Sequence, residues 1–140
     1  MNYLLDTCVI SELVKKKSDK KVVSWLEACD EEFLFLSVLT IGEIQKGITK
    51  LEDSKRKTSI QNWLDKDLLE RFDDRILPLT IEIASTWGQI QGEAEMCGES
   101  IPTIDGLLGA TAVTHNLTIV TRNEKDIKGS GARVLNPWNL

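Results

Sequence analysis

Residues 3–12, YLLDTCVISE, decide the fold that this sequence predicts. The apolar run at residues 3–5 stops at Asp6, which is typical of a short strand buried on both faces. After Asp6, apolar residues recur at helical spacing until the lysines that begin at Lys15, so a helix follows the strand directly. A buried strand that passes straight into a helix favours a parallel sheet, and it places Asp6 at the carboxyl end of its strand.

Strands and helices continue to alternate along the chain. Further short strands are predicted at residues 33–36, 76–79, 117–121 and 133–135. Further helices are predicted around residues 22–26, 41–51, 54–73, 84–98 and 103–115. Ser37 or Thr40 is expected to cap the helix at residues 41–51, and Thr103 to cap the helix at residues 103–115. Pro78 indicates a strand end or an edge strand. The pattern predicts an α/β fold with a mostly parallel sheet.

Length and composition agree with one folded domain. The chain has 140 residues, of which 41% are hydrophobic and 28% charged, so we expect a single domain over residues 1–140. No apolar run approaches the ~18 residues that span a bilayer, and no basic and apolar leader opens the sequence. We therefore expect a cytoplasmic protein with no membrane partner.

Charge, cysteine and histidine counts exclude several classes of function. The net charge is −5, and so the chain is a poor candidate for holding nucleic acid through its bulk field. Three cysteines without CxxC spacing predict neither a zinc site nor a disulfide framework. The single histidine, His115, cannot supply a catalytic triad or a histidine-rich metal site. A nucleic-acid enzyme whose acidic residues surround a metal remains compatible with these counts.

Several acidic residues follow strands or adjoin apolar helix faces. Asp6 ends the first strand, Glu43 adjoins an apolar stripe in mid-helix, and Asp105 lies in the first turn of its helix. Each has an ordinary structural alternative, as a helix cap or a solvated side chain. Gly109 leaves the surface beside Asp105 nearly bare, which either permits close packing or leaves room for a ligand. Asp126 offers a fourth carboxylate after the strand at residues 117–121.

Together these acids predict a divalent-metal site. Parallel strands bring their carboxyl ends to one edge of the sheet, and ligands gather there. Converging carboxylates repel one another unless a cation lies between them, and Mg²⁺ or Mn²⁺ takes oxygen ligands. Such a site can activate water and neutralise a phosphodiester without any histidine.

Five short segments carry a family resemblance. They are residues 4–12 (LLDTCVISE), 36–44 (LSVLTIGEI), 104–112 (IDGLLGATA), 120–123 (VTRN) and 136–138 (NPW). In content and order they resemble the PIN-domain ribonucleases, and specifically the VapC-type toxins of bacterial toxin–antitoxin pairs. The resemblance covers nearly the whole chain and implies a PIN-like fold of three layers, in which about five short strands lie between helices.

The resemblance also implies a set of site residues. Asp6, Glu43 and Asp105 would be the catalytic carboxylates and metal ligands. The family often has a fourth acid where this chain has Asn123, so either Asp126 takes that role or a neutral donor completes the site. Thr7, Ser11, Thr121 and Asn123 are candidates to orient the ligands. Cys8 departs from the usual Asn or Ser, and we interpret it as a small buried hydrophobe.

The implied activity is hydrolysis of an RNA phosphodiester by a metal-activated water. The cofactor would be Mg²⁺, with Mn²⁺ able to substitute, and the products would carry 5′-phosphate and 3′-hydroxyl ends. The implied partners are RNA, a VapB-type antitoxin and a second copy of the chain. A haloacid dehalogenase-type phosphatase needs an acid at position 8, and a response-regulator receiver needs an acidic pair at positions 6 and 7, so both fit poorly. The alternative is a catalytically weak or inactive interaction module.

Two basic clusters could attract RNA to this acidic protein. They are residues 15–21, with five lysines, and residues 50–57, with three lysines and Arg56. The structural alternative for both is a solvated helix end or loop.

Overall fold

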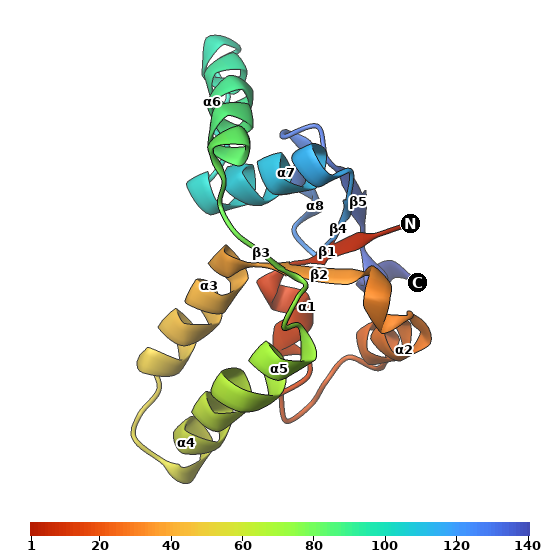
Figure 1. The fold of residues 1–140 in the computed structure, drawn as a ribbon, viewed down its shortest axis with the longest axis vertical. Coiled ribbons are helices and arrows are strands. Elements are labelled where there is room, and N and C mark those ends of the chain that lie inside the picture. The colour runs from red at the N-terminus through yellow and green to blue at the C-terminus, as the bar shows by residue number, and fades with distance from the viewer.

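A computed structural model describes residues 1–140 and shows one sheet of five parallel strands (Figure 1). The strands are β1 (Tyr3–Leu5), β2 (Leu34–Ser37), β3 (Ile76–Leu77), β4 (Thr118–Val120) and β5 (Arg133–Leu135). Their order in the sheet is β3-β2-β1-β4-β5. The α/β fold with a parallel sheet is therefore confirmed, and β3 is the edge strand that Pro78 indicated. Because β1 pairs with β2 on one side and β4 on the other, the strand order reverses at β1.

Eight α-helices connect or follow the strands. They are α1 (Thr7–Ser11), α2 (Lys20–Ala28), α3 (Val38–Thr49), α4 (Lys55–Asn62), α5 (Leu69–Arg71), α6 (Ile81–Met96), α7 (Thr103–His115) and α8 (Glu124–Lys128). Single 3₁₀ turns form at Glu31–Phe33 and Pro137–Asn139, and a π-helical turn at Trp63–Leu68 joins α4 to α5. None of the helices combines the length and the apolarity that crossing a bilayer requires.

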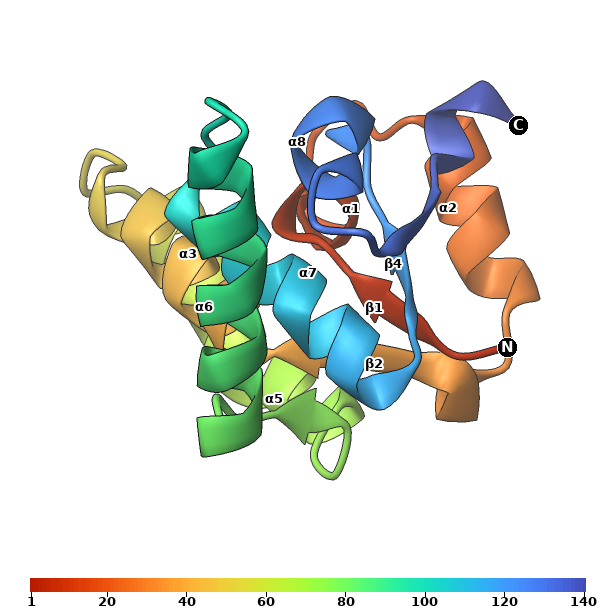
Figure 2. The same cartoon turned by 90° about the horizontal axis from the view of Figure 1, so that it is seen from above.

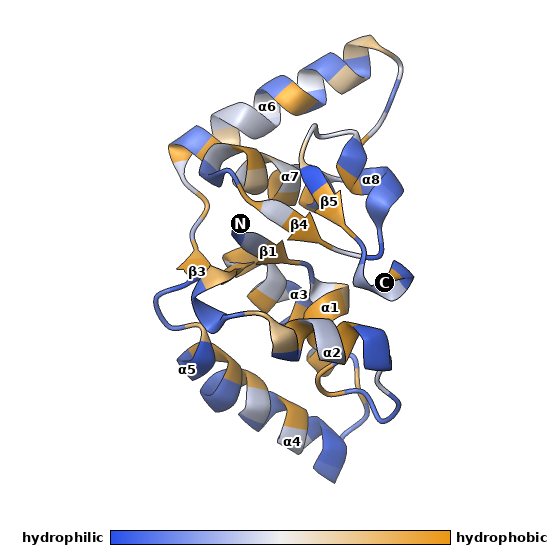
Figure 3. Ribbon diagram, turned by 90° about the vertical axis from the view of Figure 1, so that its right-hand side faces the viewer, coloured by the Kyte–Doolittle hydropathy of each residue, from blue (hydrophilic) through white to orange (hydrophobic).

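Successive residues of β1 build the cores on the two faces of the sheet. Leu4 packs in a cluster of six buried residues that includes Leu108 of α7 and Ile127 of α8. Leu5 packs in a larger cluster of 13 buried residues with side chains from α1, α2, α3 and the π-helical turn. The sheet thus forms the middle of three layers, and its strands are among the most apolar segments of the chain (Figure 3). The outer faces of α4 and α5 are mostly hydrophilic.

Helix boundaries agree with the predictions at Ser37 and differ from them at Thr103 and Leu51. Ser37 caps α3 as expected, because its hydroxyl accepts a hydrogen bond from the Leu39 amide at 3.1 Å. Thr103 is not a cap: it is the first residue of α7, and Pro102 precedes it with no side-chain hydrogen bond. The predicted apolar stripe extends too far at Leu51, which lies beyond the end of α3 and is 38% exposed.

The helix predicted for residues 54–73 is interrupted by the π-helical turn. Its apolar residues Leu64, Leu68 and Phe72 recur every four residues and are all buried. In an α-helix such a row drifts around the axis, since four residues exceed one turn of 3.6. One wider turn reverses this drift and keeps the row against the core.

Helix α6 stands away from the sheet and packs on α7 (Figures 1 and 2). Gly106 of α7 lies at this contact: a Cβ atom there would come within 3.1 Å of the Trp87 indole nitrogen of α6, so a larger residue would require the Trp87 side chain to shift. The fold therefore has a helical extension beside the layer that contains Asp105.

Candidate active site

The carboxyl ends of β1 and β4 meet where the strand order reverses, which is where ligands bind in open parallel sheets. Figure 2 shows α1, α7 and α8 gathered around these strand ends. A cavity of about 220 Å³ lies here. Its lining residues are Asp6, Thr7, Cys8, Glu43, Asp105, Arg122 and Asn123.

Asp6 is both a helix cap and a wall of this cavity. Its Oδ1 accepts a hydrogen bond from the Thr7 amide at 2.8 Å, which caps α1. Its Oδ2 accepts a hydrogen bond from the Thr121 hydroxyl at 2.7 Å. The side chain is only 6% exposed, and these two bonds fix its orientation while leaving other lone pairs on both oxygens. The capping and functional interpretations of Asp6 are therefore compatible.

Thr7 connects Asp6 to Glu43. The Thr7 hydroxyl donates a hydrogen bond to Glu43 Oε1 at 2.7 Å, so α1 holds a side chain of α3 across 36 positions of sequence. Glu43 is partly buried and lies in α3 next to the buried Ile44. The glutamate is thus directed into the cavity rather than into solvent alone.

Asp105 brings a third carboxylate from the first turn of α7. Burial, together with the negative charges of Asp6, Asp126 and Glu43, raises the pKa of Asp105 to about 6. Asp105 forms no ion pair that would offset this repulsion. A carboxylate whose pKa is raised by other carboxylates in a cavity is typical of a functional site.

The remaining candidates take different places. Asp126 lies near enough to raise the pKa of Asp105 but does not line the cavity. Asn123 does line it, and the Asn123 amide donates to the Thr121 hydroxyl at 2.9 Å, which orients that hydroxyl towards Asp6. Ser11, the last residue of α1, lies outside the cavity lining.

Cys8 is more than a space-filling side chain. Its Sγ lies 3.8 Å from Oδ2 of Asp6 and 3.6 Å from the hydroxyl of Thr121. Burial, and then the negative charge of Asp6, raises the pKa of the Cys8 thiol, which therefore stays protonated and can act as a weak donor to Asp6. Cys8 thus combines the properties of a small, largely buried hydrophobe with a weak hydrogen bond to Asp6.

Sequence reasoning missed Arg122 as a lining residue. Arg122 directly follows Thr121, and its guanidinium carbon lies 4.7 Å from the centre of the Trp138 ring. The available signal was its place in the VTRN segment, next to a residue that was already a candidate.

Gly109 serves packing and not ligand access. A Cβ atom at this position would come within 2.2 Å of the Ser130 hydroxyl. The chain after α8 therefore occupies the surface of α7 beside Gly109, whereas Asp105, one turn earlier, lines the cavity.

The donor set fits a hard divalent cation that keeps some of its water. No three His, Cys, Asp or Glu side chains lie close enough together to hold one metal ion directly. Mg²⁺ in proteins is commonly bound by one or two carboxylates, with waters and substrate phosphate completing its shell. The oxygen-rich lining and the unbalanced charge around Asp105 match that mode of binding.

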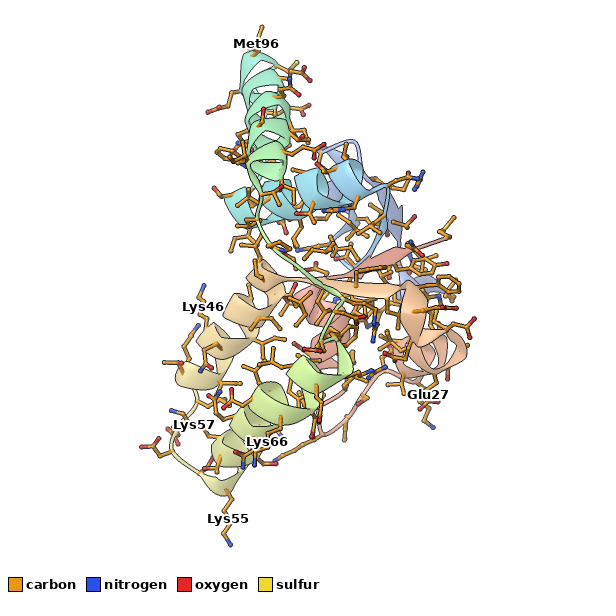
Figure 4. The ribbon with its side chains drawn as sticks, in the orientation of Figure 1. Glu27, Lys46, Lys55, Lys57, Lys66 and Met96 are labelled. Carbon is orange, nitrogen blue, oxygen red and sulfur yellow. The ribbon has the colours of Figure 1, made fainter.

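A larger groove lies elsewhere and has different chemistry. It has a volume of about 960 Å³ and lies along α4 and the π-helical turn. Its charged lining residues are Lys55, Arg56, Lys66 and Asp67. Lysines project along this part of the molecule (Figure 4). The groove offers positive charge but no cluster of carboxylates, so we assign the chemistry to the smaller cavity.

Comparisons with known proteins agree with this assignment. Residues 3–128 match the family model described as PIN domain. The chain is 34% identical to VapC ribonuclease Y4jK of Sinorhizobium fredii over 96% of each chain. It is 35% identical to toxin FitB of Neisseria gonorrhoeae over 97% of this chain and 98% of that protein. The crystal structure of FitAcB from Neisseria gonorrhoeae superimposes with a TM-score of 0.94 at 36% identity, covering 99% of both chains.

Proposed function

The chain belongs to the PIN-domain family, and from this premise we propose that it is a metal-dependent endoribonuclease that acts as the toxin of a toxin–antitoxin pair. The observation that carries the proposal is the cavity at the strand switch point, where Asp6, Glu43 and Asp105 converge. Relatives that match almost the whole chain are named as a ribonuclease and as a toxin.

Asp6 and Asp105 would hold the cation in this mechanism, and Glu43 would complete the site through water. Mg²⁺ is the proposed ion, with Mn²⁺ able to replace it, and when bound it supplies an activated water and neutralises charge on the phosphodiester. Thr121 and Thr7 keep Asp6 and Glu43 in place through their hydrogen bonds. Asp105 must lose its proton to bind a cation, and the cation's charge favours that loss.

The chain's own residues also determine the products. Glu43 accepts a hydrogen bond from the attacking water and so orients it towards phosphorus. The water oxygen forms a bond to phosphorus and its proton passes to solvent. The bond from phosphorus to the 3′-oxygen breaks, and that oxygen takes up a proton from solvent. The 2′-hydroxyl is not required, so the ends are 5′-phosphate and 3′-hydroxyl.

The proposed protein partners are an antitoxin of the VapB type and a second copy of the chain. A basic antitoxin side chain would complement the acidic cavity and block it. For the homodimer, the exposed apolar residues Ile81 and Met96 at the two ends of α6 are candidates for an interface, with exposures of 91% and 88%.

Cleavage of an end-labelled RNA pool tests the proposal. The wild type should cut in Mg²⁺ and not in EDTA, and Asp6→Asn should be inactive while keeping its thermal melt. Asp67→Asn, which removes the same charge in the larger groove, is the matched control and should remain active. Products that end in a 2′,3′-cyclic phosphate would contradict the mechanism.

The second candidate, an inactive interaction module, predicts a different pattern. Asn123 at a position where family members carry an acid favours it. Titration of Mn²⁺ into the wild type, with and without a short RNA, separates the two. Heat of binding that Asp6→Asn and Asp105→Asn abolish supports the nuclease, and a flat titration in both conditions supports the module.

A further inference from the structure

Arg122 is the one basic side chain in the acidic cavity. It is exposed, yet it belongs to none of the six ion pairs of the protein. Arg71, Arg75 and Arg133, by contrast, donate hydrogen bonds to carbonyl, carboxylate or hydroxyl oxygens. The guanidinium of Arg122 therefore keeps its hydrogen-bond donors free at the edge of the site.

The Trp138 ring holds this guanidinium in place. Its centre lies 4.7 Å from the Arg122 guanidinium carbon, within the range of a cation–π contact. Stacking engages the flat face of a guanidinium and leaves the N–H groups at its edge available for planar recognition of an anion. The contact with Trp138 thus orients Arg122 without using its hydrogen-bond donors.

Trp138 is itself firmly anchored. The Trp138 amide donates to Asn136 Oδ1 at 3.0 Å, and the Asn136 side-chain amide donates to Glu124 Oε2 at 3.0 Å. The Trp138 ring also packs against the larger hydrophobic cluster. The 3₁₀ turn at Pro137–Asn139 therefore acts as a fixed support, connected to α8, beneath Arg122.

A free, oriented guanidinium at the edge of the carboxylates fits an RNA phosphate. The carboxylates repel a polyanion, so one cation at the cavity edge offsets that repulsion where the backbone enters. Bidentate recognition by arginine also matches the geometry of a phosphate.

We propose that Arg122 binds an RNA phosphate adjacent to the scissile one, and that Trp138 is the positioning residue that orients it. The inference rests on the proposed ribonuclease function and adds a substrate-binding residue outside the carboxylate set. It predicts that Arg122 contributes to RNA affinity and to its salt dependence, and contributes less to the chemical step.

The test measures binding of a short fluorescein-labelled single-stranded RNA of mixed sequence by anisotropy, in Mg²⁺ and across a salt series. Every variant carries Glu43→Gln, so that cleavage does not interfere. Arg122→Gln should weaken binding about tenfold, as expected for a charge-assisted hydrogen bond. The slope of log affinity against log salt should fall by about 0.7, the value for one phosphate contact on a single strand. Arg133→Gln removes the same charge from β5 and should change neither quantity.

Trp138 is tested by rescue. Trp138→Leu keeps an apolar side chain but removes the aromatic face, and it should raise KM several-fold in the active protein with a smaller change in kcat. Trp138→Phe should restore most of the affinity, because a phenyl ring still offers a cation–π surface. A role confined to folding would instead lower the melting temperature with no change in the salt slope.

The outcomes distinguish the role of Arg122 from the proposed ribonuclease activity. A wild type that binds and cleaves RNA while Arg122→Gln binds equally well, with an unchanged salt slope, overturns the assignment of Arg122 alone. A wild type that neither binds nor cleaves RNA overturns both. Unchanged RNA affinity with weakened capture of a co-expressed antitoxin would assign Arg122 to the partner protein instead.

Discussion

Two acidic regions of the molecule use the same residue types in opposite electrostatic settings. Glu31, in the 3₁₀ turn before β2, accepts hydrogen bonds from Arg71 at 2.9 Å and from Arg75 at 3.0 Å. The hydrogen bond and charge of Arg71, followed by those of Arg75, hold the pKa of Glu31 below its usual value. In the cavity, burial and three other carboxylates raise the pKa of Asp105 to about 6.

The difference separates structural charge from functional charge. The Glu31 cluster is neutralised within the protein, and it ties the turn before β2 to the segment before β3. The Asp105 cluster is left unneutralised, which costs stability in the absence of a cation. A fold tolerates such a cost where binding of a ligand offsets it, as at active sites.

Neutralising Asp105 should have the largest effect on the acidic cavity. We expect Asp105→Asn to lower RNA cleavage about a thousandfold, because loss of metal-based charge stabilisation is worth several kcal/mol. The same change should raise the melting temperature of the metal-free protein by about 3 °C, since it removes like-charge repulsion. Cleavage assays and thermal melts in EDTA measure both effects. A variant that is less stable and fully active would show that Asp105 has a structural role and no functional one.

Removing Arg75 should have the converse effect. This side chain is 15% exposed and donates to the carbonyl oxygens of Leu34 at 2.6 Å and Arg71 at 2.5 Å, as well as to Glu31. Arg75→Ala leaves these acceptors without a donor, so we expect a loss of about 2–3 kcal/mol in the free energy of unfolding. Denaturant unfolding measures the loss, and cleavage per folded molecule should be unchanged. Arg71→Ala, at a more exposed position, is the milder control.

Thr7→Val tests whether the cavity depends on orientation as well as charge. Valine keeps the shape of threonine but cannot donate to Glu43 Oε1. We expect kcat to fall about tenfold, the lower end of the range for residues that orient metal ligands. Thr58→Val, on the exposed face of α4, is the matched control and should retain full activity. Equal loss in the two variants would show that Thr7 has no specific role.

The pH dependence of stability should show the smallest effect and should have opposite signs in the two regions. Asp105 binds its proton more tightly in the folded state, so the metal-free protein should lose about 1 kcal/mol, after solvent screening, as pH rises from 3.8 to about 6. Glu31 binds its proton less tightly when folded, so its stabilisation is present above pH 4.5 and is lost as pH falls through its lowered pKa.

Thermal melts across this range, in EDTA, measure both contributions. Asp105→Asn should abolish the decline between pH 3.8 and about 6, and Glu31→Gln should abolish the loss at more acidic pH. Identical profiles for wild type and Asp105→Asn would mean that the charge of Asp105 is not repelled in solution.

The order of apolar and polar residues along the sequence was sufficient to predict the strands. The apolar run before Asp6 predicts a strand buried on both faces, and Pro78 predicts a strand end or an edge strand; the structure has both. The same patterns cannot by themselves bring Asp6, Glu43 and Asp105 into one cavity, because Asp6 caps α1 whereas Glu43 and Asp105 lie on α3 and α7. Their convergence follows only once the strand order is known.

Features that depend on contacts between distant side chains could not be read in this way. The stacking of Arg122 on Trp138 joins two elements through a turn that no periodicity describes. The approach of Ser130 to Gly109 depends on how closely the chain after α8 can pack on α7. The π-helical turn responds to the core beneath Leu64 and Leu68, which the i, i+4 row alone cannot reveal.

The hydrogen bond from Thr121 to Asp6 has a consequence for the timing of synthesis. The two residues are 115 positions apart, so Asp6 leaves the ribosome long before the hydroxyl that orients it exists. At 5–20 residues per second, that interval is roughly 6–23 s. The central strand and the first carboxylate of the site therefore spend most of translation without β4 and Asp105. A growing chain has no complete cavity, and the cell meets the active form only after Thr121 has been made.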